Sequence, residues 1–121
     1  MSNKNNKKTE EKIAKIVVRD IAQSPFKLRL IADLVRGLSA QEALDTVEFL
    51  NKKGTTTVKK ALLSAIDSAI NKYGVTKEDL VVSHISVDGA RVIKKGLYSA
   101  KGRFSLATRR RSHLNLELKV K

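Results

Sequence analysis

The residues best suited to chemistry in this chain are cations gathered in one segment, residues 88–113. The segment contains eight lysines and arginines and a single carboxylate, Asp88. Such side chains bind anions, and the planar guanidinium of arginine suits phosphate oxygens especially well. The pattern therefore predicts ionic contacts with a polyanion. The basic residues are Arg91, Lys94, Lys95, Lys101, Arg103, Arg109, Arg110 and Arg111.

Two aromatic residues, Tyr98 and Phe104, interrupt the basic run and could stack on unpaired bases. Aromatic residues make up only 4% of the chain, so phosphate contacts should dominate and affinity should fall steeply with salt. Gly96 and Gly102 permit bends. A disordered, merely solubilising loop is the alternative, although an apolar residue such as Ile93 would serve no purpose in it.

Residue sets for catalysis or metal binding are missing from the sequence. The chain has no cysteine, which excludes disulfides, thiolate metal sites and a cysteine nucleophile, and fits a reducing compartment. Gly54 opens a threonine-rich stretch that lacks the spacing of a phosphate-binding loop. His84 and His113 have no metal-ligand spacing around them, so we expect surface or RNA-contacting side chains. We predict no enzyme activity, no metal and no cofactor.

The elements that must position the basic segment can be predicted from hydrophobic periodicity. Residues 13–21 read IAKIVVRDI, a β-branched run typical of a strand. Ser24 and Pro25 form the N-cap and first turn of a helix that Gly37 ends, and Ser39 begins a second helix with a capping box. The apolar positions expected to face the core are Leu28, Ile31, Leu34 and Val35 in the first helix, and Ala43, Leu44, Val47 and Leu50 in the second.

The strongest periodic signal is a third helix that Gly74 is placed to end. Its apolar residues recur at steps of three and four along one stripe, which predicts burial in the core and nothing more. The stripe consists of Val58, Ala61, Leu62, Ala65, Ile66, Ala69, Ile70 and Tyr73.

From residue 81 the period changes to two, which predicts half-buried strands at both ends of the basic segment. If these strands pair antiparallel, residues 88–113 form one long hairpin with its bend near Gly96–Gly102. Arms of about ten residues would reach roughly 33 Å, beyond the roughly 14 Å radius of such a domain. The alternating sets are Val81, Ser83, Ile85 and Val87 against Val82, His84 and Ser86, and Leu114, Leu116, Leu118 and Val120 near the C-terminus.

Three consecutive arginines, residues 109–111, would place cations on both faces of this hairpin. A two-stranded ribbon is marginally stable in water by itself. We therefore expect its order to come from a nucleic acid that surrounds it.

The charge is distributed unevenly over 121 residues, a length typical of a single domain. The net charge is +13, of which +8 belongs to residues 81–121. Residues 1–12 are predicted to be a flexible basic arm, and residues 13–121 one domain that includes the hairpin. The longest uncharged run has eight residues, so we expect neither a membrane-spanning helix nor a signal peptide.

Several of these segments together resemble large-subunit ribosomal protein twenty-two of the bacterial type. The resemblance covers about residues 13–120. It rests on residues 23–37 (QSPFKLRLIADLVRG), 43–44 (AL), 51–53 (NKK), 100–103 (AKGR) and 110–113 (RRSH).

This resemblance implies an α+β fold, with three helices packed on a small antiparallel sheet and a long protruding β-hairpin. It implies a structural constituent of the large subunit that binds 23S-type rRNA, supports its assembly and lines the nascent-peptide exit tunnel with its hairpin tip. The implied partners are several rRNA domains, neighbouring ribosomal proteins and the nascent polypeptide, in a cytoplasmic bacterial ribosome. No membrane partner and no homo-oligomer are expected.

Residue roles follow from the same resemblance. Residues 96–99 (GLYS) depart from the more basic, proline-containing stretch expected at that point of the hairpin. Lys94, Lys95, Ser99, Lys101, Gly102 and Arg103 are expected at or near the tunnel-lining tip. The expected rRNA-binding residues are Lys27, Arg29, Lys52, Lys53, Lys60, Arg91, Lys101, Arg103, Arg109, Arg110, Arg111 and His113.

A free-standing basic nucleic-acid-binding protein or chaperone is the alternative function. A helix-turn-helix reader of DNA would carry its cations on a recognition helix. In this chain the cations concentrate on the predicted hairpin, which favours the ribosomal function.

Overall fold

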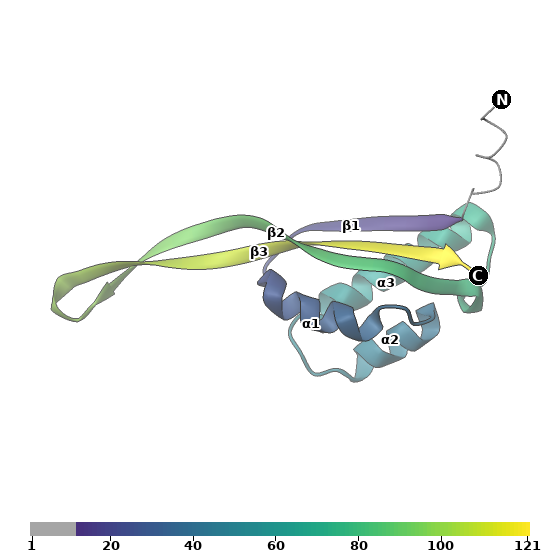
Figure 1. Cartoon of the computed structure of the whole chain (residues 1–121), viewed down its shortest axis with the longest axis horizontal. Helices are drawn as coiled ribbons and strands as arrows, with labels where there is room; N and C mark the ends of the chain where they lie inside the picture. The colour runs from purple at the N-terminus through teal and green to yellow at the C-terminus, as the bar shows by residue number, and fades with distance from the viewer. Residues whose placement is uncertain (1–11) are drawn as a thin grey trace, which may run out of the picture.

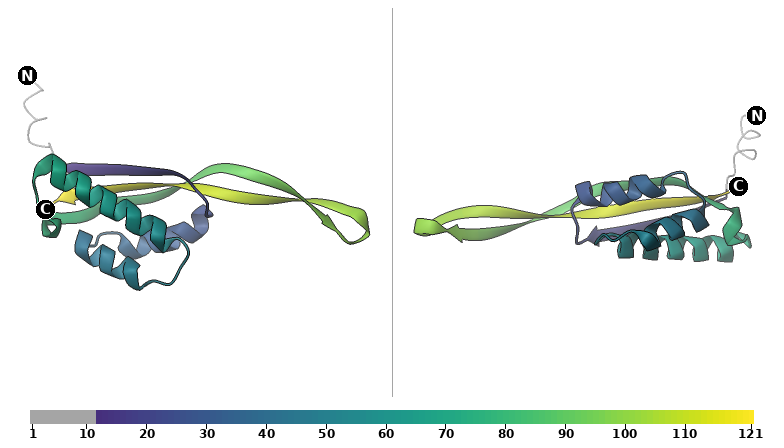
Figure 2. Two further views of the ribbon diagram at one scale, coloured as in Figure 1. Left: turned by 180° about the vertical axis from the view of Figure 1, so that it is seen from behind. Right: turned by 90° about the horizontal axis from the view of Figure 1, so that it is seen from below.

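The computed structural model describes residues 12–121 and has the predicted α+β architecture. A three-stranded antiparallel sheet in the order β1-β3-β2 carries three helices on one face and continues at one end into a long two-stranded ribbon (Figure 1). The helices lie under one half of the sheet's length, and the ribbon projects beyond them (Figure 2). The elements are β1 (Ile13–Ile21), α1 (Pro25–Val35), α2 (Ala40–Phe49), α3 (Thr55–Tyr73), the short 3-10 helix η2 (Lys77–Asp79), β2 (Leu80–Ser99), a second 3-10 turn η3 (Ala100–Gly102) and β3 (Arg103–Val120).

Both predicted serine N-caps are present. Ser24 Oγ accepts a hydrogen bond from the backbone N–H of Lys27 at 3.4 Å, and Ser39 Oγ accepts one from Glu42 at 3.3 Å. Each bond satisfies a backbone donor that the first helical turn leaves unpaired. Of the predicted N-terminal arm, residues 1–12, only Lys12 is among the described residues.

Two glycines delimit α3 for different reasons. Gly74 ends the helix as predicted, in a left-handed conformation with φ of 65°. Gly54 precedes the helix because there is no room for a side chain: an added Cβ would lie 2.4 Å from Gln23 Oε1 and 2.8 Å from Ile31 Cδ1.

The core lies between the helices and one face of the sheet, and the α3 stripe runs through it. One prediction for α1 is wrong, because Leu34 is 47% exposed and Ala32 is fully buried in its place. Leu34 lies at the edge of the α1 stripe, where the helix turns away from the sheet. Ile70 of α3 is also 37% exposed. The buried α3 residues are Val58, Ala61, Leu62, Ala65, Ile66 and Ala69.

A β-bulge in β2 makes the predicted alternation of this strand partly wrong. The register steps from Val82 opposite Leu118 to His84 opposite Glu117, so Ser83 is an extra residue. An extra residue reverses which positions face the core. Leu80 and Val82 are therefore buried before the bulge, and Ile85 and Val87 after it, whereas Val81 is only half-buried.

Two further irregularities mark the place where the sheet becomes a ribbon. The register of β1 shifts between Val18 and Ile21, and that of β2 shifts between Gly89 and Val92. Both shifts lie opposite the same part of β3, residues 111–113. We call this place the hairpin root.

Beyond the root, residues 92–99 pair with residues 103–110, and no third strand from the described residues 12–121 joins them. Eight residues of strand span about 26 Å. The bend is the η3 turn, where Lys101 and Gly102 have φ of 63° and 70°. The bend lies at one end of the predicted range, because Gly96 remains within β2.

Candidate nucleic-acid interface

A cluster around Asp20 holds the hairpin root together. Arg111 Nε donates to Asp20 Oδ1 at 2.6 Å, and the terminal nitrogen of Arg111 donates to the Asp20 carbonyl, also at 2.6 Å. Arg91 approaches the other carboxylate oxygen at 3.5 Å. The Asp20 backbone N–H donates to His113 Nδ1 at 3.0 Å, which requires that this ring nitrogen carry no proton. We call these four residues the root cluster.

The backbone of Asp20 makes this arrangement possible. Its φ is 57°, in the left-handed region that aspartate and asparagine tolerate better than most residues. This conformation occurs at the point where the register of β1 against β3 shifts, between Val18 and Ile21. Asp20 therefore interrupts the ladder to β3, which resumes at the pair of Ile21 and Ser112, and presents its carboxylate to the arginines.

Two further contacts fasten α1 and the residues that precede it to the same region. Arg29 donates to the carbonyl of Val87 through Nε at 3.2 Å and through a terminal nitrogen at 3.0 Å. The hydroxyl of Ser112, which is fully buried, donates to the Gln23 carbonyl at 2.9 Å. These bonds fix the direction in which the ribbon leaves the globular part.

A hollow of about 650 Å³ lies in the angle between α1 and the ribbon. We call it the root hollow. Six of its lining residues are basic and none is acidic, and the N-terminus of α1 opens into it at Ser24. A helix N-terminus and a set of cations both favour an anion. The lining residues are Ala22, Gln23, Ser24, Lys27, Lys53, Ile93, Lys95, Thr108, Arg109, Arg110 and Arg111.

Cations lie on both faces of the ribbon, as predicted. Arg110 pairs with Val92 and Arg109 with Ile93, and neighbouring cross-strand pairs point to opposite faces. By the same alternation, Lys94 shares the face of Arg110, and Lys95 and Arg103 share the face of Arg109. Residues 89–112 contain no acidic residue, so neither face carries a compensating charge.

An aromatic pair lies near the bend. The rings of Tyr98 and Phe104 meet edge to face, with centroids 5.5 Å apart. Phe104 also covers Gly96, where an added Cβ would lie 2.4 Å from the ring. Tyr98 is 82% exposed and Phe104 58%, so both rings remain accessible to a partner.

The structure distributes the predicted site residues over four sets, of which two share Arg111. Lys27, Lys53, Lys95 and Arg109–Arg111 meet at the root hollow, and Ser99, Lys101, Gly102 and Arg103 form the bend. Arg29, Arg91, Arg111 and His113 also bond within the chain, so they help to position the ribbon. Lys60 lies apart, on a groove beside β1, and Lys52 and Lys94 are exposed.

Three residues at this site have no signal in the sequence. Gln23 and Thr108 line the root hollow, and Asp20 anchors the root cluster. Asp20 and Arg111 are 91 positions apart, so only tertiary structure brings them together.

Other kinds of site are not evident in the part of the chain that the structure describes. Within residues 12–121, no group of three histidine, cysteine or acidic residues could hold a metal ion. No described helix combines the length and apolar character needed to cross a bilayer.

Comparison with known proteins gives one consistent result. Residues 3–119 match the family model for ribosomal protein L22p/L17e. A protein of Fusobacterium nucleatum subsp. nucleatum named large ribosomal subunit protein uL22 is 44% identical over 103 residues, which cover 85% of this chain and 93% of that protein. A protein of Herpetosiphon aurantiacus with the same name is 38% identical over 103 residues, covering 85% and 91%.

Proposed function

The chain belongs to the ribosomal protein L22p/L17e family and is a structural, non-enzymatic constituent of the large ribosomal subunit, and from this premise we propose that its hairpin binds large-subunit rRNA and lines the peptide exit tunnel. The bacterial sources of the relatives support a cytoplasmic bacterial ribosome as its location. Family membership favours this role over that of a free-standing nucleic-acid-binding protein or chaperone.

The observation that carries rRNA binding is the root hollow. Six cations converge there from α1, from the loop before α3 and from both arms of the ribbon, without a carboxylate among the lining residues. Like charges held this close repel one another unless an anion lies between them. A folded RNA offers phosphates to the hollow and to both ribbon faces at once.

The exposed rings near the bend add a second kind of contact. Tyr98 and Phe104 present faces on which unpaired bases could stack. Because the remaining ribbon contacts are ionic, they position the protein without reading base sequence. We therefore expect rRNA recognition through shape and phosphate placement, and we expect it to support assembly by holding several RNA segments together.

Salt-dependent binding of the full chain to large-subunit rRNA tests this proposal. The double variant Lys27→Gln with Lys53→Gln should lower the slope of log K against log salt concentration by about 1.4–1.8 and weaken binding. Lys72→Gln with Lys121→Gln removes the same charge from outside the root hollow and should change the slope by less than half as much. Equal effects of the two pairs would contradict the proposed site.

The tunnel-lining role concerns the bend itself. Because the chain has no cysteine, Ser99→Cys introduces a unique thiol there. In ribosomes stalled with a cysteine-bearing nascent chain, Ser99→Cys should form a disulfide cross-link to that chain. Phe49 lies on the globular part and is 87% exposed. The control variant Phe49→Cys should therefore carry an accessible thiol but form no cross-link to the nascent chain. Absence of the Ser99→Cys cross-link in assembled, translating ribosomes would refute the role.

A further inference from the structure

An open sheet edge runs along β1 in the globular part. β1 is an outer strand, and its ladder to β3 uses every second residue. The N–H of Val120 donates to the carbonyl of Lys12. Because hydrogen-bonded positions alternate along an antiparallel strand, the backbone N–H and C=O groups of Ala14, Ile16 and Val18 also point toward β3. The backbone groups of Ile13, Lys15, Val17 and Arg19 therefore point outward.

Only the first of these outward positions is satisfied. The hydroxyl of Tyr73 accepts from the N–H of Ile13 at 3.2 Å and donates to its carbonyl at 2.9 Å. Among residues 12–121, no group bonds the outward backbone of Lys15, Val17 or Arg19. A row of alternating donors and acceptors thus remains open, as a template for one more strand.

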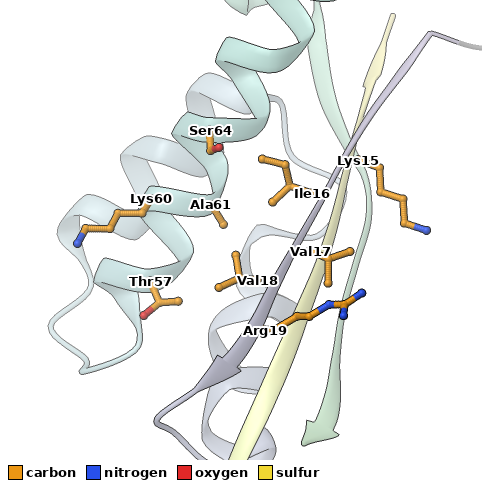
Figure 3. Close-up of a pocket in the computed structure, with 9 residues that line it drawn as sticks. All are labelled: Lys15, Ile16, Val17, Val18, Arg19, Thr57, Lys60, Ala61 and Ser64. Atoms are coloured by element: carbon orange, nitrogen blue, oxygen red, sulfur yellow. The ribbon is translucent and has the colours of Figure 1, made fainter.

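A groove of about 620 Å³ accompanies this edge, between β1 and α3 (Figure 3). The side chains of Ile16 and Val18 point across it toward Ala61 and Ser64 of α3 (Figure 3). An extended segment laid along β1 would place every second side chain over these apolar groups.

The remaining side chains of such a segment would meet the opposite face of the sheet. Lys15, Val17 and Arg19 point to that face, away from α3 (Figure 3). Lys15 makes one weak contact, 3.9 Å from Glu117, and its side chain is 62% exposed. Directly opposite or diagonal cross-strand partners of these cations should be acidic.

We propose that the β1 edge binds an extended segment of another protein in which apolar and acidic residues alternate. The apolar residues would fill the groove against α3, and the acidic residues would pair with Lys15 and Arg19. Strand addition of this kind draws affinity from main-chain bonds and specificity from alternate side chains. The inference does not depend on the rRNA-binding role of the hairpin.

Two other occupants fit the edge less well. A second copy of this chain would bring Lys15 and Arg19 against the same residues of its partner, and like charges across strands destabilise pairing. RNA phosphates accept hydrogen bonds but donate none, so an RNA backbone could pair the outward carbonyls of β1 only through its 2′-hydroxyl groups.

A peptide titration of the isotope-labelled full chain tests the proposal. The probe is the blocked peptide Glu-Val-Glu-Val-Glu-Val-Glu, and the control peptide contains the same residues as a Glu block followed by a Val block. Saturation with the probe should slow hydrogen exchange at the amides of Lys15, Val17 and Arg19 at least tenfold. The control peptide should have no such effect.

Variants separate the backbone contribution from the charge contribution. Val17→Pro deletes one outward N–H without touching the ladder to β3, and should weaken probe binding at least tenfold. Should this variant fold poorly, a probe N-methylated on its β1-facing amides applies the same test to the intact chain. Arg19→Glu should weaken binding several-fold, whereas Lys121→Glu, away from this edge, should have a smaller effect.

Several results would overturn the proposal. The first is that the N-methylated probe binds as tightly as the unmodified probe. The second is that a heptauridylate oligonucleotide protects the same amides better than the probe does. The third is that these amides become protected when the protein concentration alone is raised, as they would in a complex of two copies of this chain. None of these results bears on the salt-dependent rRNA binding of the Lys27→Gln with Lys53→Gln variant, so the two proposals can fail separately.

Discussion

Substitution of Asp20 should loosen the hairpin root by a predictable amount. In Asp20→Asn the left-handed backbone is retained, and Arg111 keeps its bond to the main-chain carbonyl. What is lost is the carboxylate charge that faces Arg111 at 2.6 Å and Arg91 at 3.5 Å. A charged hydrogen bond contributes about 1.5–3 kcal/mol, and exposed pairs contribute less.

The exposure of the partners sets the estimate. The side chain of Arg111 is 26% exposed and that of Asp20 is 41% exposed, so we expect a loss of about 1 kcal/mol. For a domain of this size, that corresponds to a fall in Tm of about 4 °C. Asp20→Ala adds left-handed strain and should be about 1 kcal/mol less stable than Asp20→Gly, which accepts the same φ without strain.

Thermal unfolding of the free chain, together with hydrogen exchange at residues 89–92, measures both effects. Arg19→Gln is the matched control, because it removes a charge one residue away that forms no ion pair with any of residues 12–121, and its effect should stay within about 0.5 kcal/mol. An Asp20→Asn protein with unchanged Tm and unchanged exchange would show that the root cluster does not hold the ribbon. Equal stability of the alanine and glycine variants would refute the backbone argument.

Four further sequence changes probe the ribbon and the core. Gly96→Ala should displace the ring of Phe104, because the new Cβ would lie 2.4 Å from it. Loss of the nuclear Overhauser contacts between the ring and residue 96 would report this displacement, and the stability should change by less than about 0.5 kcal/mol because the ring is exposed. Replacing residues 94–108 by Asn-Gly keeps the pair of Ile93 and Arg109 beside a two-residue turn. This replacement should leave Tm within about 3 °C of the wild-type value, since the replaced segment has no buried residue. Collapse of the far-ultraviolet circular dichroism would contradict a division between globular part and ribbon. Leu116→Ala should cost about 2–5 kcal/mol in urea denaturation and Leu106→Ala less than about 0.5 kcal/mol, because the first leucine is fully buried and the second is 65% exposed.

Most of the local structure could be predicted because the signals are local. The caps at Ser24 and Ser39, the end of α3 at Gly74 and the α3 stripe each depend on residues within one or two helical turns. The family could be identified for a similar reason, since residues 100–103 and 110–113 form short continuous motifs.

Predictions failed where a second element decides the outcome. The bulge at Ser83 depends on how β2 aligns with β3, and it changed which valines are buried. Leu34 has an apolar side chain, but the path of α1 across the sheet leaves it exposed. A single strand or helix contains no information about such a neighbour.

The candidate site shows the same division. The sequence by itself determined that the cations concentrate in the hairpin and that consecutive arginines face both of its sides, because strand alternation requires only the order of residues. The tertiary structure alone decided that Lys27 and Lys53 join the hairpin cations while Lys60 does not, that Asp20 anchors Arg111, and that the edge of β1 stays open. The physical reason is that charge and periodicity are properties of the chain, whereas a hollow, an ion pair across 91 positions and a free strand edge exist only once the elements have packed together.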